Sequence, residues 1–347
     1  MSAKFTELYE LAGVIIGEAN KIAIIQADNP DGDSLGSALA LEHIVGDLGK
    51  EPLLYCGVDM PHYLRYMEGW DRVTDELPSD IDAAVIVDTS TPTLLEKLVE
   101  QGLDKKLHKT PTVVLDHHRS VEQQISYADV VINDPAKSST GELLFSLATH
   151  HDWSINHQAA EHIMTAILGD TQGLSNDLAT STTYQAMATL IEFGANRPAL
   201  EEKRRAFGKM PEVIYRYKAK LIERTELAVN GLLAYVVLTQ EEINQYSPLY
   251  NPAPLIQGDM LQIDSVGVSI VIKKYDDGKI TGSIRANPAY PYAAKIAASL
   301  GGGGHQYAAG FKTQGNTSLD LVLRDIHDTL EQALDDAQST SSKEGAS

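Results

Sequence analysis

Acidic side chains cluster in one short stretch near the start of the sequence. Residues 27–36 read ADNPDGDSLG, and they follow an apolar run at 22–25 and precede a helical pattern at about 34–48. Three carboxylates in a tight Pro/Gly turn after a strand are difficult to pack, but they suit a divalent cation that prefers oxygen ligands. The alternative is a polar loop in which Asp28 or Asp33 caps the following helix. The stretch by itself leaves both interpretations open.

Two further groups of acidic and imidazole side chains follow apolar runs that predict buried strands. Asp88 comes directly after the run at 83–87, and the tripeptide Asp-His-His at 116–118 follows the run at 112–115. Ligands of parallel sheets lie outside the carboxyl ends of the strands. We therefore expect these groups to share one crevice with the carboxylates of 27–36.

The tripeptide at 116–118 places two imidazoles side by side. Adjacent side chains of an extended chain point in opposite directions, so His117 and His118 cannot both face the same way. One of them can bind a metal ion while the other faces a substrate, as a phosphate contact or proton donor. Without the other carboxylates, a polar loop would be the better interpretation.

A fourth carboxylate stands where a helix ends. The segment 167–173 reads ILGDTQG and follows a helical pattern at about 157–168. A helix C-terminus disfavours negative charge, so a nearby cation would explain the position of Asp170. A solvent-exposed aspartate at an ordinary helix end is the alternative.

A run of four glycines supplies the second candidate site. Residues 301–310 read GGGGHQYAAG, and glycine permits backbone conformations that other residues avoid. The N–H groups of such a run can form a concavity that holds an anion, and His305 can add a side-chain donor. Arg285, at the end of the preceding strand pattern, is the cationic partner expected for a phosphate. A flexible turn is the alternative.

The scaffold that must position these groups is predicted to be α/β. In the first half, strand patterns alternate with helical ones, which predicts a doubly wound parallel sheet. The strands are expected at about 22–26, 51–55, 83–87, 112–115 and 128–132, and the longer helices at 6–19, 34–48, 92–101, 139–150, 157–168 and 182–193.

The second half predicts a smaller α/β domain with a mixed sheet. Its strands are expected at 232–238, 266–272 and 280–285, and its helices at about 291–300 and 317–336. We expect a first domain at 1–195, a helical linker at 196–229, a second domain at 230–336 and a disordered tail at 337–347. The basic residues between 203 and 224 alternate with Glu, which favours a solvated helix face over a substrate-binding patch.

Composition limits the class of protein and of partner. The chain has 347 residues, one cysteine and a net charge of −20. The single cysteine excludes an intramolecular disulfide, and no apolar run is long enough for a membrane span. The opening residues lack the order of a secretory signal, so we expect a cytoplasmic protein without membrane contact. The acidic charge argues against long duplex nucleic acid but leaves a small anionic substrate open.

Taken together, the motifs resemble those of the DHH phosphoesterase superfamily. They resemble most the branch with a DHH-associated C-terminal domain, which holds the NrnA-like nanoRNase/pAp phosphatases and the cyclic-di-AMP phosphodiesterases. The first motif is matched at 30–37, the second at 87–89, the third at 116–118, the fourth at 169–171 and the glycine-rich signature at 301–310. These matches follow the family order from about residue 22 to 311.

The resemblance implies a dinuclear manganese site and hydrolysis of short nucleotides such as nanoRNA, pAp, and linear or cyclic dinucleotides. The implied metal ligands are Asp31 on one ion, Asp33 on the other, Asp88 as the bridge, and His117 and Asp170 completing the second site. The implied catalytic residues are His118, which would face the scissile phosphate, and Asp116. The implied substrate-binding residues, across an interdomain cleft, are Ser283, Arg285, Gly302, Gly303, Gly304 and His305.

The sequence departs from the family at one position. The family usually has a ligand histidine four residues before the first motif aspartate, and this chain has Ala27 there. Asp28 is the tentative replacement, as in aspartate-rich first motifs of RecJ-like members. Otherwise the first metal site is weakened or empty.

Two other functions stay open at this stage. A RecJ-like single-strand exonuclease would be expected to need a basic track with stacking aromatics, which the sequence lacks. A catalytically lapsed nucleotide-binding protein is the alternative that Ala27 suggests. Homodimers are common among enzymes, and nothing in the sequence decides for or against one here.

Overall fold

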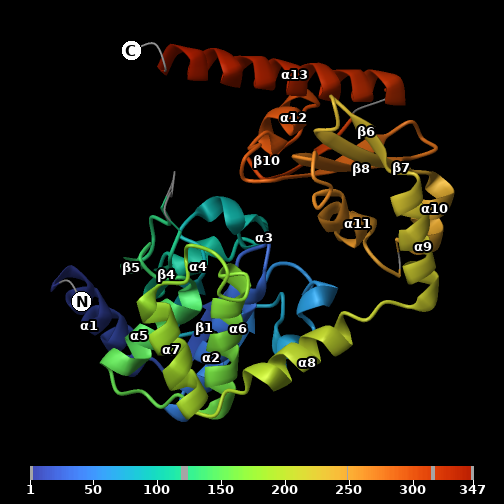
Figure 1. Ribbon diagram of the computed structural model, residues 1–347. Coiled ribbons are helices and arrows are strands. Elements are labelled where there is room, and N and C mark those ends of the chain that lie inside the picture. Colours follow the sequence, from blue (N-terminus) through green and yellow to red (C-terminus); the bar gives the residue numbers. More distant parts are fainter. Residues whose placement is uncertain (1–2, 119–123, 248, 314–316, 345–347) are drawn as a thin grey trace. The chain divides into compact units, whose positions relative to one another are not determined.

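The computed structural model describes residues 3–118, 124–247, 249–313 and 317–344 of the chain. The chain forms two compact units, Met1–Lys209 and Met210–Ser347 (Figure 1). The boundary between them falls inside the segment expected as a linker. Each unit has its own sheet and its own hydrophobic core.

The first unit is built on five parallel strands. They are β1 (Lys21–Ile25), β2 (Glu51–Tyr55), β3 (Ala83–Val87), β4 (Thr112–Asp116) and β5 (Val130–Asn133). Their order across the sheet is β2-β1-β3-β4-β5. This arrangement confirms the predicted parallel sheet.

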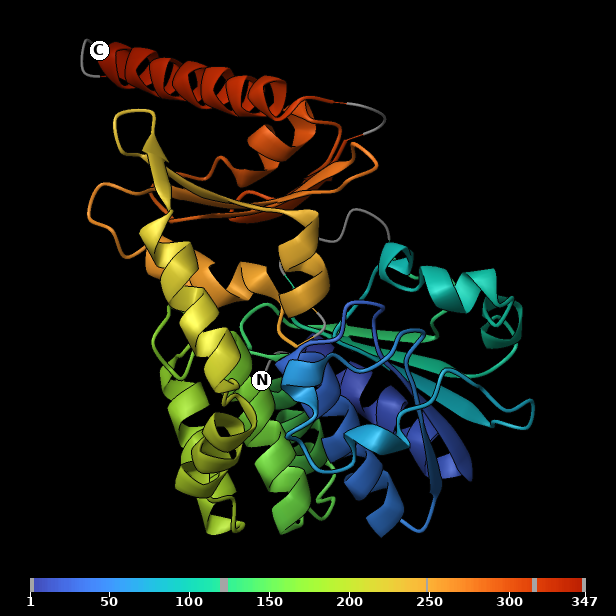
Figure 2. The same ribbon diagram turned by 90° about the vertical axis from the view of Figure 1, so that its right-hand side faces the viewer.

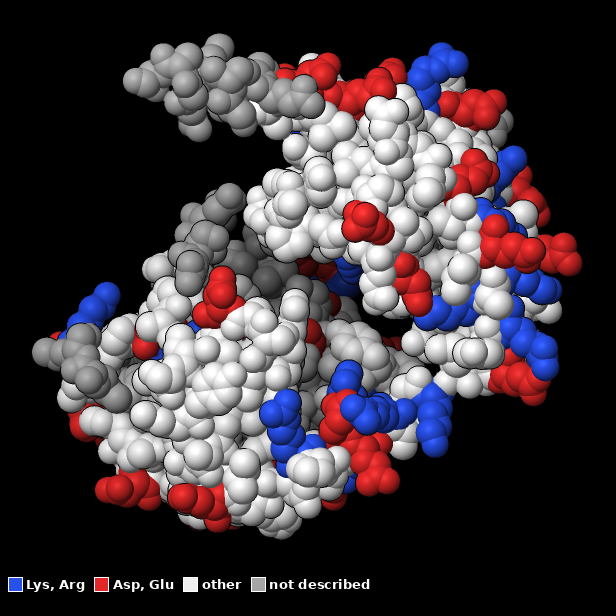
Figure 3. Space-filling model, in the orientation of Figure 1, with Lys and Arg blue, Asp and Glu red and all other residues white. Residues whose placement is uncertain are grey.

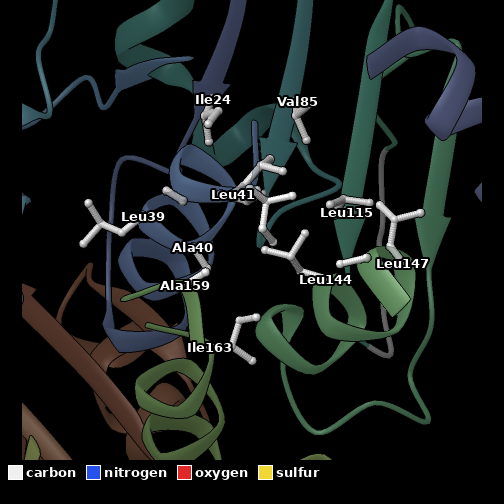
Figure 4. Close-up of a cluster of buried hydrophobic side chains, with 14 of the residues drawn as sticks. Ile24, Leu39, Ala40, Leu41, Val85, Leu115, Leu144, Leu147, Ala159 and Ile163 are labelled. Atoms are coloured by element: carbon white, nitrogen blue, oxygen red, sulfur yellow. The ribbon is translucent and has the colours of Figure 1, made fainter. Parts of the chain in front are cut away.

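Helices cover both faces of this sheet. They are α1 (Ala3–Glu18), α2 (Gly32–Asp47), α3 (Glu96–Glu100), α4 (Asp104–Leu107), α5 (Thr140–His150), α6 (His157–Asp170), α7 (Ser181–Glu192) and α8 (Arg197–Phe207), with 3₁₀ segments η1 (His62–Leu64), η2 (Trp70–Arg72) and η3 (Pro92–Leu94). On one face, Ile24, Val85 and Leu115 pack against α2, α5 and α6 (Figure 4). On the other face, Ile25 and Ile86 pack with Leu98 of α3. Because alternate residues face two covered sides, the interior positions of the strands are apolar, and the charged residues lie at strand ends, such as Lys21, Glu51 and Asp116.

The strand order creates a place for a ligand site at the carboxyl ends of the strands. In the sheet, β2 lies on one side of β1 and β3 lies on the other. The direction in which successive strands are added therefore reverses between β1 and β3. Open parallel sheets bind ligands outside the carboxyl ends of the strands at this reversal. The turn at 27–36 follows β1, and Asp88 follows β3, so both lie at this position.

The second unit is built on a mixed sheet, as predicted. Its strands are β6 (Glu226–Ala228), β7 (Leu233–Leu238), β8 (Val268–Lys274), β9 (Ile280–Ala286), β10 (Gly303–His305) and β11 (Ala308–Lys312), in the order β10-β11-β9-β8-β7-β6. Only β7 and β8 pair in parallel among these strands of the described residues. The helices are α9 (Glu212–Glu223), α10 (Gln240–Tyr246), α11 (Pro252–Met260), α12 (Ala293–Ser299) and α13 (Leu319–Glu344). Helices α12 and α13 cover one face of the sheet, and α9 and α11 the other (Figure 2).

The structure changes two of the expected boundaries. The segment 196–229 is not one linker, because Leu200 of α8 packs on the core of the first unit while Ile214 of α9 is buried in the second. The tail expected at 337–347 is largely helical, since α13 continues to Glu344.

Helix α11 was not predicted, because its prolines indicate a loop. Its N-cap is Asn251, whose side chain accepts a hydrogen bond from the N–H of Ala253, and Pro252 occupies the first helical position. Proline is tolerated there because that N–H has no partner within the helix. No helix among the described residues is both long and apolar enough to cross a membrane.

Candidate metal centre

Asp33 is the deepest carboxylate of the turn that follows β1. It lies in the first turn of α2 and is fully buried. Its carboxylate accepts hydrogen bonds from the backbone N–H groups of Thr140 (2.7 Å) and Gly141 (3.0 Å) at the start of α5, and from Ser37 Oγ (3.1 Å). The first N–H groups of a helix have no partner within it. The buried charge of Asp33 is therefore stabilised by the N-terminal ends of two helices.

The turn that carries Asp33 lies close to the end of α6. A Cβ on Gly169 would lie 3.6 Å from the Cα of Gly32, an ordinary van der Waals distance, so the two backbone segments are near neighbours. Within α2, a Cβ on Gly36 would come 2.8 Å from a backbone carbonyl oxygen of α6. This close approach brings Asp170, the last residue of α6, to the side of Asp33.

Asp88 is held in an unfavourable backbone conformation. Its φ is 63°, in the left-handed region that few residues other than glycine adopt. Such strain is concentrated at functional sites. Thr140 Oγ1 donates a hydrogen bond of 3.2 Å to its carboxylate. Burial, with the neighbouring charges of Asp33 and Asp31, raises the pKa of Asp88 well above its usual range.

The two adjacent histidines lie in different environments. His117 is buried, with its side chain 7% exposed, whereas that of His118 is 55% exposed. Nδ1 of His117 lies 3.4 Å from the carbonyl oxygen of Lys137, so its Nε2 faces the carboxylates. Asp116 orients His118, because its Oδ1 lies 2.7 Å from His118 Nδ1 and accepts the backbone N–H groups of both histidines.

At the carboxyl ends of the strands, two sets of three side chains bring ligand atoms within 4.8 Å of one another. They are Asp33, His117 and Asp170, and Asp88, His117 and His118. In the first set, Nε2 of His117 lies 2.9 Å from Asp170 Oδ2 and 3.4 Å from Asp33 Oδ2, yet it is buried without a well-formed hydrogen bond. Two carboxylates and one imidazole match the ligand preference of Mn²⁺ and similar cations. The residues present therefore fit a metal ion.

The electrostatics of the cluster show an excess of negative charge. Burial raises the pKa of Asp170 to about 6, and the charges of Asp33 and Asp31 add to the effect. Burial lowers the pKa of His117, but the close approach of the Asp170 carboxylate and the charge of Asp33 outweigh it and raise this pKa to about 9. A proton on His117 thus occupies the position where a cation would fit.

Asp31 and Asp28 lie outside both sets of ligand atoms. Asp31 is the N-cap of α2, and its Oδ1 accepts the N–H groups of Asp33 (2.9 Å) and Ser34 (3.0 Å). Asp28 Oδ2 accepts the N–H of Lys97 at 2.8 Å, near the start of α3. The structure therefore does not bring Asp28 into the cluster to replace the histidine missing at Ala27.

The glycine run of the second unit is partly an edge strand. Gly303–His305 forms β10, which pairs with β11, so the open concavity expected there is a hairpin instead. A Cβ on Gly302 would lie 2.2 Å from the carbonyl oxygen of Gly310, and one on Gly304 would lie 2.6 Å from the Cα of Ala309. Close packing between strands thus explains both glycines.

Strand pairing in the second sheet places two of the other expected substrate-binding residues, His305 and Arg285, at the same level across the sheet. His305 pairs with Ala308, and Ala308 pairs with Arg285, so these backbone positions are level across three strands. Arg285 is exposed at the end of β9, while Ser283 Oγ lies 3.4 Å from Gln257 Oε1. The side chain of His305 lies outside the described part of the chain.

Glu142 is a buried residue near the cluster that the sequence reasoning missed. Its carboxylate, 1% exposed, accepts the N–H and Oγ of Ser138 (3.1 and 2.6 Å) and Oγ1 of Thr183 (2.8 Å). The Ser139-x-x-Glu142 spacing is the signature of a capping box, and it could have marked the start of α5. The carboxylate bonds instead to the residue before the N-cap.

Comparisons with known proteins agree with this geometry. A model described as "DHH family, N-terminal domain" matches residues 21–167, and one described as "DHHA1 domain" matches 253–334. The Mycoplasma pneumoniae "Uncharacterized protein MG371 homolog" is 30% identical over 302 residues, which cover 82% of this chain and 83% of its own length. The Thermus thermophilus "Bifunctional oligoribonuclease and PAP phosphatase NrnA" is 24% identical and covers 93% of this chain and 94% of its own.

Among solved structures, an exopolyphosphatase-related protein from Bacteroides fragilis has the same fold. Its TM-score is 0.81 at 22% sequence identity, and the match covers 94% of this chain and 96% of that one.

Proposed function

The chain belongs to the DHH family and carries a DHHA1 domain, and we propose that it is a metal-dependent hydrolase of phosphate esters in short nucleotides. The main support for this proposal is that Asp33 and Asp170 lie next to Nε2 of His117, which is buried and makes no well-formed hydrogen bond. The name of the Thermus thermophilus relative supports short oligoribonucleotides and pAp as substrates. Linear and cyclic dinucleotides belong to the same chemical class.

We propose that Asp33, His117 and Asp170 hold one Mn²⁺ ion and that Asp88 and Asp31 contribute to a second, weaker site. The second site is weaker because Ala27 offers no ligand atom and one oxygen of Asp31 is engaged in capping α2. When bound, such ions neutralise phosphate oxygens and lower the pKa of water. Asp88 belongs to one set, and its Oδ1 lies 3.8 Å from Nε2 of His117, which belongs to both sets, so we propose Asp88 as the carboxylate that contacts both ions.

His118 is the residue suited to move a proton. Its hydrogen bond with Asp116 raises the pKa of the ring, so the protonated form is favoured. Because Nδ1 is engaged by Asp116, Nε2 is the atom left to donate to the leaving oxygen of an ester. Asp116 therefore acts as the group that orients His118.

A substrate panel tests this function. The purified protein with Mn²⁺ is offered pAp, pApA, a five-mer RNA, cyclic-di-AMP, pyrophosphate and a long single-stranded DNA. We expect turnover of one or more of the short nucleotides. Preference for the long DNA would favour the RecJ-like exonuclease. A protein that turns over nothing, with Asp88→Ala and wild type equally inert, would support the lapsed nucleotide-binding protein.

Metal affinity should rise with pH. The ring of His117 must lose its proton before Nε2 can accept a metal ion, and its pKa is raised to about 9. Because this value exceeds the ordinary 6.5, the protonated ring stabilises the metal-free protein below about pH 6.5, and that contribution is lost as the pH rises toward 9. Below this pKa, each unit of pH should raise the apparent Mn²⁺ affinity by up to about tenfold.

Calorimetric titration with Mn²⁺ at pH 6.5, 7.5 and 8.5 measures this dependence. Two buffers of different ionisation enthalpy report the proton released on binding. An affinity that is constant across the three pH values, with no proton released, would show that His117 is not a ligand.

A further inference from the structure

A cleft of about 530 Å³ lies in the first unit, within the size range of small-molecule sites. It is lined by residues of α6, α8 and the turns beside them, namely Gly32, Tyr66, Thr165, Leu168, Gly169, Gln172, Gly173, Arg197, Leu200, Glu201, Arg204 and Arg205. All of these residues belong to the first unit.

The cleft adjoins the candidate metal centre through two backbone segments. Gly32 stands between Asp31 and Asp33, and Gly169 precedes Asp170. Both glycines line the cleft, and they are in contact with each other. The backbone that carries Asp33 and Asp170 therefore also forms part of the wall of this cleft.

The far wall of the cleft is a set of arginines on one face of α8. Arg197, Glu201, Arg204 and Arg205 are spaced so that they share one side of the helix. Glu201 accepts hydrogen bonds from Arg204 (2.8 and 2.9 Å) and from Arg205 (2.8 Å), which pair both guanidinium groups with this carboxylate although the two arginine side chains are 61% and 77% exposed. Arg197 donates to the carbonyl oxygen of Gly173 at 3.3 Å.

These contacts leave the wall with a net positive charge on a strongly acidic chain. Three arginines face one glutamate, while the chain as a whole carries −20. Figure 3 shows basic side chains next to acidic ones over α8. The sequence pattern favoured a solvated face for this run, and α9 fits that interpretation, since Arg216 pairs with Glu212 on an exposed surface. The arginines of α8 are exposed to a similar degree, but they line a cleft.

We propose that this cleft binds a second, non-scissile phosphate of the substrate. The proposal rests on the proposed function, because the scissile phosphate is taken to lie at the metal centre. Guanidinium groups bind phosphate through paired N–H donors, and groups already oriented by Glu201 and Gly173 lose little freedom when they do so. The site would thus select nucleotides that carry a phosphate beyond the one cleaved, such as a 5′-phosphorylated dinucleotide.

The test compares two dinucleotides that differ only in the terminal phosphate, pApA and ApA. The variant is Arg197→Ala/Arg205→Ala, and the matched control is Arg216→Ala, which removes an exposed arginine from an i,i+4 pair with Glu212. Binding is measured by calorimetry with Ca²⁺, and turnover with Mn²⁺. Bis(p-nitrophenyl) phosphate serves as a substrate with one phosphate.

We expect the affinity and the kcat/KM of the wild type and of Arg216→Ala to be tenfold or more higher for pApA than for ApA. One charged, hydrogen-bonded contact would give a difference of this size. The double variant should lose this preference through a higher KM for pApA, with its turnover of bis(p-nitrophenyl) phosphate unchanged. A preference retained by the double variant, or absent from the wild type, would overturn the proposal. If the wild type prefers pApA in binding but hydrolyses nothing, the subsite stands and the proposed function fails.

Discussion

An Asp88→Asn protein should lose about 10³-fold or more in kcat on its preferred short nucleotide while folding like the wild type. Asparagine has the shape of aspartate and tolerates positive φ, so the backbone at 63° is preserved. The change removes one charge from a carboxylate whose Oδ1 lies 3.8 Å from Nε2 of His117, the residue that the two sets share. Charge stabilisation by bound metal is worth several kcal/mol, and about 4 kcal/mol corresponds to 10³-fold in rate.

The same variant should be more stable than the wild type when metal is absent. Because the pKa of Asp88 is raised in the folded protein, ionising this group opposes folding, and the metal-free wild type loses stability as the pH rises through the titration of Asp88. A neutral Asn does not carry this cost. Thermal unfolding in EDTA at pH 7 should show a higher Tm for Asp88→Asn. If Asp88 had only a structural role, the Tm of Asp88→Asn would be lower than that of the wild type.

Asp28→Asn is the matched control, because it makes the same chemical change in the same crevice region. The Asp28 side chain accepts the N–H of Lys97, and an amide oxygen can do the same. We expect its activity and metal stoichiometry to stay close to those of the wild type. Asp88→Asn with more than a tenth of wild-type activity would contradict the metal role of Asp88. Asp28→Asn with a loss as large as that of Asp88→Asn would show that Asp28 is a ligand.

The sequence is informative about the metal centre because strand ends are easy to locate. Buried parallel strands are short apolar runs, so the residues that follow β1, β3 and β4 can be identified directly. The carboxyl ends of such strands meet at one edge of the sheet. The approach of Asp33, Asp88 and His117 therefore follows from local patterns and one rule about sheets.

Side-chain direction and backbone pairing depend on contacts that are remote in sequence. Asp28 lies one residue from Ala27, yet it turns to Lys97, which is 69 residues away. The glycine run suggests an open loop, but Gly302 and Gly304 are required by the strand that pairs beside them. The arginines of α8 look like a solvated face in sequence, and only the fold places Gly32 and Gly169 beside the same cleft.

Glu142 could not be identified from the sequence as part of the metal centre, because it contacts the proposed ligands only through other residues. It binds Ser138, and the segment 137–141 then contacts three of the proposed ligands. Lys137 O accepts from His117 Nδ1 at 3.4 Å, the N–H groups of Thr140 and Gly141 bond to Asp33, and Thr140 Oγ1 bonds to Asp88. Glu142 is thus a positioning residue for the cluster.

Glu142→Ala should therefore lower both stability and metal affinity. The substitution leaves the N–H and Oγ of Ser138 and the hydroxyl of Thr183 without their acceptor in a buried place. Loss of a buried charged acceptor costs about 3 kcal/mol of unfolding free energy. Loss of an outer-shell contact typically reduces metal affinity by about 10- to 100-fold. Thermal unfolding in EDTA and calorimetric Mn²⁺ titration measure the two effects separately.

Glu142→Gln distinguishes positioning from a purely structural role. The amide keeps one oxygen that can accept from Ser138, so the loop at 137–141 should hold its place and Mn²⁺ affinity should return to within a few-fold of the wild type. The salt bridge from Lys137, with Nζ 3.6 Å from Glu142, is lost in both variants and cannot explain a difference between them. If Glu142→Ala unfolds at a lower temperature but binds Mn²⁺ as tightly as the wild type, the segment 137–141 does not position the ligands.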